Sequence, residues 1–131
     1  MFLLVTDTII YSLKGQETVI RNLRVHADHP MHICVITMME LYFGANRSRQ
    51  VEPNLAKVRT IEEAFTILPV GPECAAVFGK LKSDLQVSGK PLDDFDLIIA
   101  SVALAHNLTV VTNNEKNFSR IPGLHFENWC A

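Results

Sequence analysis

The sequence lacks a long hydrophobic run and a recognisable export signal. Its longest apolar stretch, LIIASVALA at 97–105, is interrupted by Ser101 and is far too short to span a bilayer. The amino-terminal MFLLVTDT has no basic leader and carries an acid at position 7, so we expect no signal peptide. The sequence therefore argues against a membrane or secreted protein and predicts a cytoplasmic one.

Cysteine is scarce, and neither sign of charge dominates. The three cysteines, Cys34, Cys74 and Cys130, are widely spaced and form no Cys-x-x-Cys pair, which predicts reduced thiols and no disulfide framework. The net charge is −2 and the pI is about 6.2. This balance argues mildly against a nucleic-acid partner, unless a basic patch or a bound metal ion offsets a local acidic site.

Several motifs of common enzymes are also absent. The chain has no Gly-x-x-x-x-Gly-Lys loop, no Gly-x-Gly-x-x-Gly turn and no Gly-x-Ser-x-Gly elbow. Mechanisms that use a Ser, Cys or His nucleophile therefore have little support.

The hydrophobic pattern that is present predicts an α/β fold. The chain has 131 residues, of which 48% are hydrophobic, so we expect a single domain over residues 1–131. Short apolar runs alternate with segments of helical periodicity, which is typical of a mostly parallel sheet covered by helices on both faces. The expected strands span 2–5, 32–36, 65–70, 108–112 and 124–129, and the expected helices span 16–27, 37–44, 50–65, 72–88 and 93–105.

Acidic residues occur at comparable places in this pattern. Asp7 follows the first strand, Glu40 lies early in the helix after the second strand, and a third acidic group begins the helix before LTVVT: Asp93, Asp94 and Asp96. Parallel strands bring their carboxyl ends to one edge, where sites collect. Carboxylates in one cleft repel one another, and a divalent cation resolves that repulsion. Oxygen ligands favour Mg²⁺ or Mn²⁺ and indicate phosphoryl transfer or phosphodiester hydrolysis.

Each acid also has an ordinary structural explanation. Asp7 can cap a helix that starts at Thr8 or Ile9, and Glu40 can complete a capping box with Thr37 as the N-cap. Asp93 and Asp94 suit the amino-terminal end of a helix dipole. Asp96 is harder to explain in this way because apolar core residues follow it, and it shares a helix face with Asp93.

A histidine group offers a different metal site. His26, His29 and His32 are spaced by three residues and lie close to Cys34, a pattern that can serve zinc. Pro30 breaks any helix through them, so the three imidazoles need not share a face.

Three segments of the chain resemble a known protein family. The segments LLVTDT at the amino terminus, ITMMELYFGA at 36–45 and PLDDFDLIIASVALAHNLTVVTNNEKNFSRIPGLHFENW at 91–129 resemble the PIN-domain family, and within it the VapC toxins of bacterial VapBC toxin–antitoxin pairs. The resemblance runs in order over nearly the whole chain. It implies a three-layer α/β/α PIN-like domain around a short parallel sheet. It also implies a Mg²⁺- or Mn²⁺-dependent endoribonuclease that cuts RNA, including tRNA, a VapB-type antitoxin partner and a homodimer.

The resemblance assigns roles to individual residues. Asp7, Glu40 and Asp96 match the family's metal-binding and catalytic acids, and Asn114 stands where many relatives have a fourth acid. The TNN segment resembles a subgroup of VapC toxins that reads the same there. Asn114 can still ligate a metal or hold a water, but it adds no negative charge.

The neighbours of these acids are predicted to support them. The candidates to contact the metal ligands, without binding the ion themselves, are Thr8, Thr112, Asp93 and Asp94. Ile9 departs from the family motif, which usually has Asn two residues after the first acid, and Thr8 is the alternative source of a polar contact to Asp7.

Other functions stay open at this stage. A catalytically weakened binding module that acts through its antitoxin is favoured by Ile9 and Asn114. A phosphatase of the haloacid-dehalogenase type requires the motif Asp-x-Asp, and here Ile9 stands where the second Asp would be. A DNA nuclease shares the same metal chemistry. Basic residues that could steer a phosphate backbone are Arg47, Arg49, Lys80 and Lys82.

Overall fold

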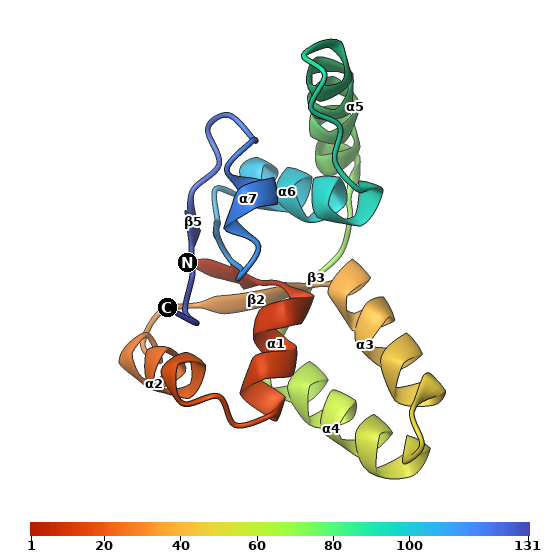
Figure 1. The fold of residues 1–131 in the computed structure, drawn as a ribbon, viewed down its shortest axis with the longest axis vertical. Coiled ribbons are helices and arrows are strands. Elements are labelled where there is room, and N and C mark those ends of the chain that lie inside the picture. Colours follow the sequence, from red (N-terminus) through yellow and green to blue (C-terminus); the bar gives the residue numbers. More distant parts are fainter.

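The computed structural model describes all residues from Met1 to Ala131 and contains five strands and seven helices (Figure 1). The strands pair in the order β3-β2-β1-β4-β5, and every pairing is parallel. The predicted α/β class with a short, mostly parallel sheet is confirmed. The strands are β1 (Phe2–Leu4), β2 (Met31–Cys34), β3 (Thr66–Leu68), β4 (Thr109–Val111) and β5 (Phe126–Glu127).

Helices cover both faces of the sheet and make three layers (Figure 1). Helices α5, α6 and α7 lie on one face, and the other four helices lie on the opposite face. The helices are α1 (Thr6–Leu13), α2 (Glu17–Val25), α3 (Val35–Arg47), α4 (Val51–Ala64), α5 (Pro72–Val87), α6 (Asp94–His106) and α7 (Glu115–Phe118). None of these helices is long and apolar enough to cross a membrane.

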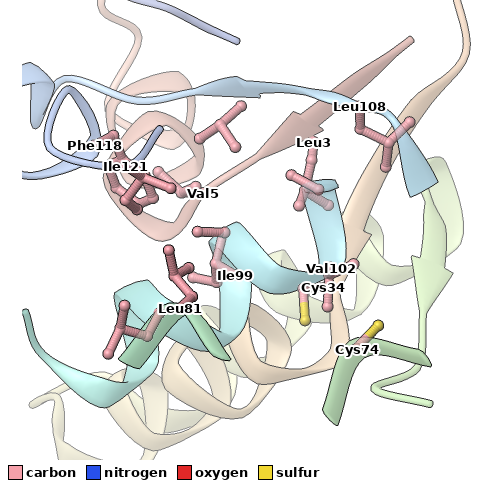
Figure 2. Close-up of a cluster of buried hydrophobic side chains, with 14 of the residues drawn as sticks. Leu3, Val5, Cys34, Cys74, Leu81, Ile99, Val102, Leu108, Phe118 and Ile121 are labelled. Atoms are coloured by element: carbon pink, nitrogen blue, oxygen red, sulfur yellow. The ribbon is translucent and has the colours of Figure 1, made fainter. Parts of the chain in front are cut away.

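The two cores follow from the alternation of side chains along the strands. In β1, Leu3 packs with α5 and α6, while Phe2 and Leu4 pack with α1 to α4. Figure 2 shows the first of these cores, which Val102 and Ile99 of α6 enter from the helix side. Because β1 is covered on both faces, all three of its residues are buried, which explains its continuous apolar run.

Helix α1 corrects the interpretation of Asp7 as a cap. The sequence predicts a helix before residue 16 only if Asp7 caps one that starts at Thr8 or Ile9, whereas α1 begins at Thr6. Its N-cap is Val5, which makes no side-chain capping bond, so Asp7 lies inside the first turn and does not cap the helix. The carboxylate there instead faces the loop after β4, which donates hydrogen bonds to it.

Helix α3 corrects the predicted capping box. It begins at Val35, two residues before the predicted start at 37. Its N-cap is Cys34 and not Thr37, and no side chain caps it. Thr37 is therefore in the first turn, fully buried, with a hydroxyl that has no hydrogen-bond partner. Glu40 lies in the second turn, where its carboxylate is free to face another element.

The carboxyl-terminal segment also differs from its prediction. The expected strand over 124–129 is limited to Phe126–Glu127, and the short helix α7 was not predicted. Asn114 begins α7 as its N-cap, and its side-chain oxygen accepts a hydrogen bond from the Asn117 amide at 3.4 Å. This local capping fixes the chain directly after β4.

Candidate active site

A small acidic cleft opens beyond the carboxyl ends of β1 and β4, where α1, α3 and α6 meet it. Its volume is about 190 Å³. Its walls contain Asp7, Glu40 and Asp96, with Asn114 and Thr112, and no lysine or arginine. The other lining residues are Val5, Thr6, Ile99 and Phe118. The parallel topology thus brings together the four predicted site residues, which are separated by up to 107 positions in the sequence.

Asp7 is held by the segment that follows β4. Its Oδ2 accepts hydrogen bonds from the Asn113 backbone amide at 3.1 Å and from the Thr112 hydroxyl at 3.3 Å. Its Oδ1 lies 3.2 Å from the hydroxyl of Thr8, whose single proton is shared between Asp7 and the Val111 carbonyl at 3.0 Å. The first turn of α1 adds the favourable end of a helix dipole. These contacts fix the carboxylate while leaving it on the cleft wall.

Glu40 reaches the cleft from α3. Its Oε1 accepts a 2.7 Å hydrogen bond from the Thr6 hydroxyl at the start of α1. This bond joins two elements that are 34 positions apart in the sequence. Thr6 was not predicted as a site residue, and the only local sign of it was a hydroxyl directly before Asp7.

Asp96 lies half-buried in the first turn of α6. Burial raises the pKa of its carboxyl group, and the negative charges of Asp93 and Asp7 add to this effect. A hydrogen bond from the Asn117 side-chain amide, at 3.3 Å to Oδ2, opposes the shift in pKa. Asn117 was also missed by the sequence analysis, because its approach to Asp96 depends on how α7 packs against α6.

The PIN domain family matches residues 2–124. The chain belongs to the PIN domain family. The tRNA(fMet)-specific endonuclease VapC of Salmonella typhimurium is 36% identical over 129 residues, covering 98% of each chain. Ribonuclease VapC2 of Rickettsia felis is 34% identical over 131 residues and also covers 98% of each chain.

Solved structures give the same relationship. The crystal structure of VapBC2 from Rickettsia felis, bound to a DNA fragment from their promoter, contains a chain that is 34% identical to this one. The two chains superpose with a TM-score of 0.93, and the match covers 98% of each. The resemblance to VapC proteins stated from sequence motifs is therefore confirmed.

Two acids of this PIN domain are engaged outside the cleft. Asp93 is the N-cap of α6, and its side chain accepts a hydrogen bond from the Phe95 amide at 3.0 Å. Asp94 pairs with Lys82 of α5, with 3.0 Å between Oδ1 and Nζ. Neither lines the cleft. Asp93 still acts on the site through its charge, which helps to raise the pKa of Asp96.

Two neighbours of Asp7 in this PIN domain are both buried, but only one of them contacts its carboxylate. The side chain of Ile9 is fully buried in the core below α1 and does not reach the cleft. Thr8 is also buried, but its hydroxyl touches the Asp7 carboxylate. The polar contact that Ile9 does not supply therefore comes from Thr8, and from Thr112 across the sheet edge.

The histidine group does not form a metal site. His26 stacks on Trp129 with 4.8 Å between ring centroids, and its Nδ1 faces the Asn22 carbonyl. His29 pairs with Asp28, and the Nδ1 atom of His32 faces the Phe2 carbonyl. The Nδ1 atoms of the three rings thus face three different partners and do not point to a common ion position.

Proposed function

We propose that this PIN domain is a metal-dependent endoribonuclease and the toxin of a VapBC-type toxin–antitoxin pair. The observation that carries the proposal is the convergence of Asp7, Glu40 and Asp96 on one cleft that no basic side chain lines. The names of the VapC relatives, an endonuclease specific for tRNA(fMet) and a ribonuclease, support the same activity. We take residues 1–131 to act as one domain.

The side chains of the cleft fit a hard divalent cation. Asp7, Glu40 and Asp96 offer carboxylate oxygens, and the nearby Asn114 offers an amide oxygen, which are the donors that Mg²⁺ and Mn²⁺ prefer. The raised pKa of Asp96 supports this fit, because it reflects buried negative charge that lacks a positive partner. We assign Mg²⁺ or Mn²⁺ to the three carboxylates. When bound, such an ion stabilises negative charge on a phosphate and makes a neighbouring water more acidic.

In this proposal, individual residues have separate roles in hydrolysis. Thr112, Asn113 and Thr8 fix Asp7, so that its carboxylate does not turn away when RNA enters. Glu40, held by Thr6, orients the water that attacks the scissile phosphate in line with the leaving oxygen. Asn114 contributes a neutral polar contact at the rim.

The substrate we propose is RNA, with tRNA as the first candidate because of the Salmonella relative. Exposed loops and single strands suit a cleft of this small size better than a duplex, since they present separate phosphates and unstacked bases. We therefore also propose that the reaction takes place in the cytoplasm.

The partner we propose is a VapB-type antitoxin. The Rickettsia felis relative was crystallised as VapBC2 on promoter DNA, which supports such a pair here. The outer side of α3 carries two large exposed apolar side chains, Met39 and Phe43. A protein that covers them would remove this apolar surface from water. We also propose a homodimer, on the family resemblance.

The test is cleavage of total cellular RNA by the purified, antitoxin-free protein. Reactions contain Mg²⁺, Mn²⁺ or EDTA, and single-stranded DNA of matched length serves as a second substrate. We expect discrete RNA fragments that require the metal and disappear in Asp7→Ala. Asp84→Asn is the matched control, since Asp84 is an exposed acid that pairs with Lys80 on α5.

The outcomes separate the candidate functions. Cleavage that persists in folded Asp7→Ala contradicts the assignment of the cleft. Absence of cleavage with either metal, in a folded protein that still binds its antitoxin, favours the catalytically weakened binding module, with Asn114 as the disabling change. Cleavage of DNA at a rate similar to that of RNA contradicts the ribonuclease assignment.

A further inference from the structure

A second group of metal-binding side chains lies outside the acidic cleft. Glu73 and Cys74 are in the first turn of α5, and His106 is the last residue of α6. The ligand atoms of the three residues lie within 4.8 Å of one another. His106 is about ten residues beyond Asp96 on the same helix, so the group is roughly 15 Å from the acidic cleft along the axis of α6.

One carboxylate oxygen faces both of the other ligands. Glu73 Oε1 lies 3.4 Å from His106 Nε2 and 3.7 Å from Cys74 Sγ. In a tetrahedral zinc site, bonds of about 2.1 Å to nitrogen or oxygen and about 2.3 Å to sulfur place an N···O pair about 3.4 Å apart and an S···O pair about 3.6 Å apart. The two observed distances therefore match two edges of a zinc tetrahedron.

The environment of each ligand suits an ion at the boundary between core and solvent. Cys74 is fully buried, and Figure 2 shows its sulfur at the edge of the core, near Cys34 and Val102. The side chains of Glu73 and His106 are 53% and 36% exposed, so an ion and a water ligand can enter from solvent. The carboxyl-terminal end of α6 also carries the negative end of the helix dipole beside His106.

We propose that Glu73, Cys74 and His106 bind one Zn²⁺, with water as the fourth ligand. A thiolate and an imidazole favour zinc over Mg²⁺ or Mn²⁺, which separates this site from the acidic cleft by ligand chemistry as well as by position. Binding removes the proton of the Cys74 thiol, and the ion takes the place of the contacts that Glu73 now makes with the other two residues.

The consequence for the fold is a link between α5 and the end of α6. These two helices form the outer layer over one core, and α6 carries Asp96 at its opposite end. The proposed zinc ion thus links the two helices and stabilises the one that holds an acid of the cleft, from a position outside that cleft.

The test measures metal binding by the full-length protein, without RNA. Metal-free protein is titrated with Co²⁺, which absorbs in the near ultraviolet when a thiolate binds it, and Zn²⁺ is then added to displace it. We expect one thiolate-bound ion per chain, with a band that zinc removes, and a rise in Tm with zinc. His106→Gln and Glu73→Gln change exposed side chains and should weaken zinc binding at least tenfold, and Cys74→Ser should abolish the thiolate band.

Matched controls locate the ion. Cys130→Ser removes a cysteine outside the group, and His29→Gln removes a histidine that pairs with Asp28 in a similar way, so both should bind zinc like the parent. Asp96→Asn, in the acidic cleft, should leave the thiolate band and its loss on zinc addition unchanged. The proposal is overturned by a folded protein that gives no thiolate band, or by zinc binding that His106→Gln and Glu73→Gln do not weaken. Neither result bears on RNA cleavage.

Discussion

The substitution Thr37→Val should stabilise the protein. Thr37 is fully buried in the first turn of α3, and its hydroxyl is the only buried side-chain polar atom without a hydrogen-bond partner. Valine has nearly the same shape and a similar helix propensity, so the substitution replaces an unpartnered hydroxyl with a methyl group and leaves the helix otherwise unchanged.

The magnitude follows from that hydroxyl. An unsatisfied buried polar group costs about 1–3 kcal/mol. We expect most of this to be recovered, which raises the free energy of unfolding by about 1–2 kcal/mol and Tm by about 4–8 °C for a chain of this size. RNA cleavage should not change, because Thr37 does not line the acidic cleft.

The assay is urea and thermal unfolding in EDTA, with Thr60→Val as the matched control. Thr60 is an exposed helical threonine whose hydroxyl donates to the Ala56 carbonyl, so its substitution should change stability by less than about 0.5 kcal/mol. The capping-box interpretation predicts the opposite sign for Thr37→Val, a loss of about 1 kcal/mol. A fall in stability would therefore refute the assignment of Cys34 as the N-cap and of an unpartnered hydroxyl at Thr37.

Three further predictions concern the acidic cleft. The pKa of Asp96 is raised in the folded protein, so its protonated carboxyl group favours the folded state. This stabilisation is fully present at acidic pH and is lost as the pH rises through the raised pKa. Asp96→Asn should therefore unfold at a higher temperature than the parent in EDTA at neutral pH, and the difference in Tm should shrink toward about pH 4. A parent protein that is more stable than Asp96→Asn at neutral pH would contradict this. Asp94→Asn should keep cleavage near the parental rate and cost less than about 1 kcal/mol, because its pair with Lys82 is exposed; a cleavage defect as large as that of Asp96→Asn would put Asp94 in the site. Thr112→Val should slow cleavage while Thr112→Ser keeps it, since the hydroxyl positions Asp7; equal rates in the two variants would show that the Asn113 amide suffices.

Local sequence determined most of the elements, though not α1 or α7, and most of the acids. Hydrophobic periodicity marks the buried strands and amphipathic helices because it depends only on neighbours along the chain, and strands separated by helices favour a mostly parallel sheet. That topology in turn predicts that Asp7 and Glu40 meet at one edge. The same pattern adds the Asp93, Asp94 and Asp96 group, and the family motifs then select Asp96 from it and add Asn114; both line the same cleft.

The tertiary structure decided what holds those acids in place. The start of α1 at Thr6 and of α3 at Val35 depends on packing against the sheet, which overrode the expected caps at Asp7 and Thr37. The partners of the acids are distant in sequence: Thr112 reaches Asp7 over 105 positions, and Asn117 reaches Asp96 over 21.

The second ligand group, on α5 and α6, also depends on the tertiary structure. His106 is 32 positions beyond Cys74, and nothing in their spacing marks a ligand pair. Only the packing of α5 against α6 brings the imidazole to the thiol and to Glu73. The sequence by itself thus placed the acids at the ends of their elements, whereas their hydrogen-bond partners and the second ligand group exist only because of long-range packing, which local patterns do not encode.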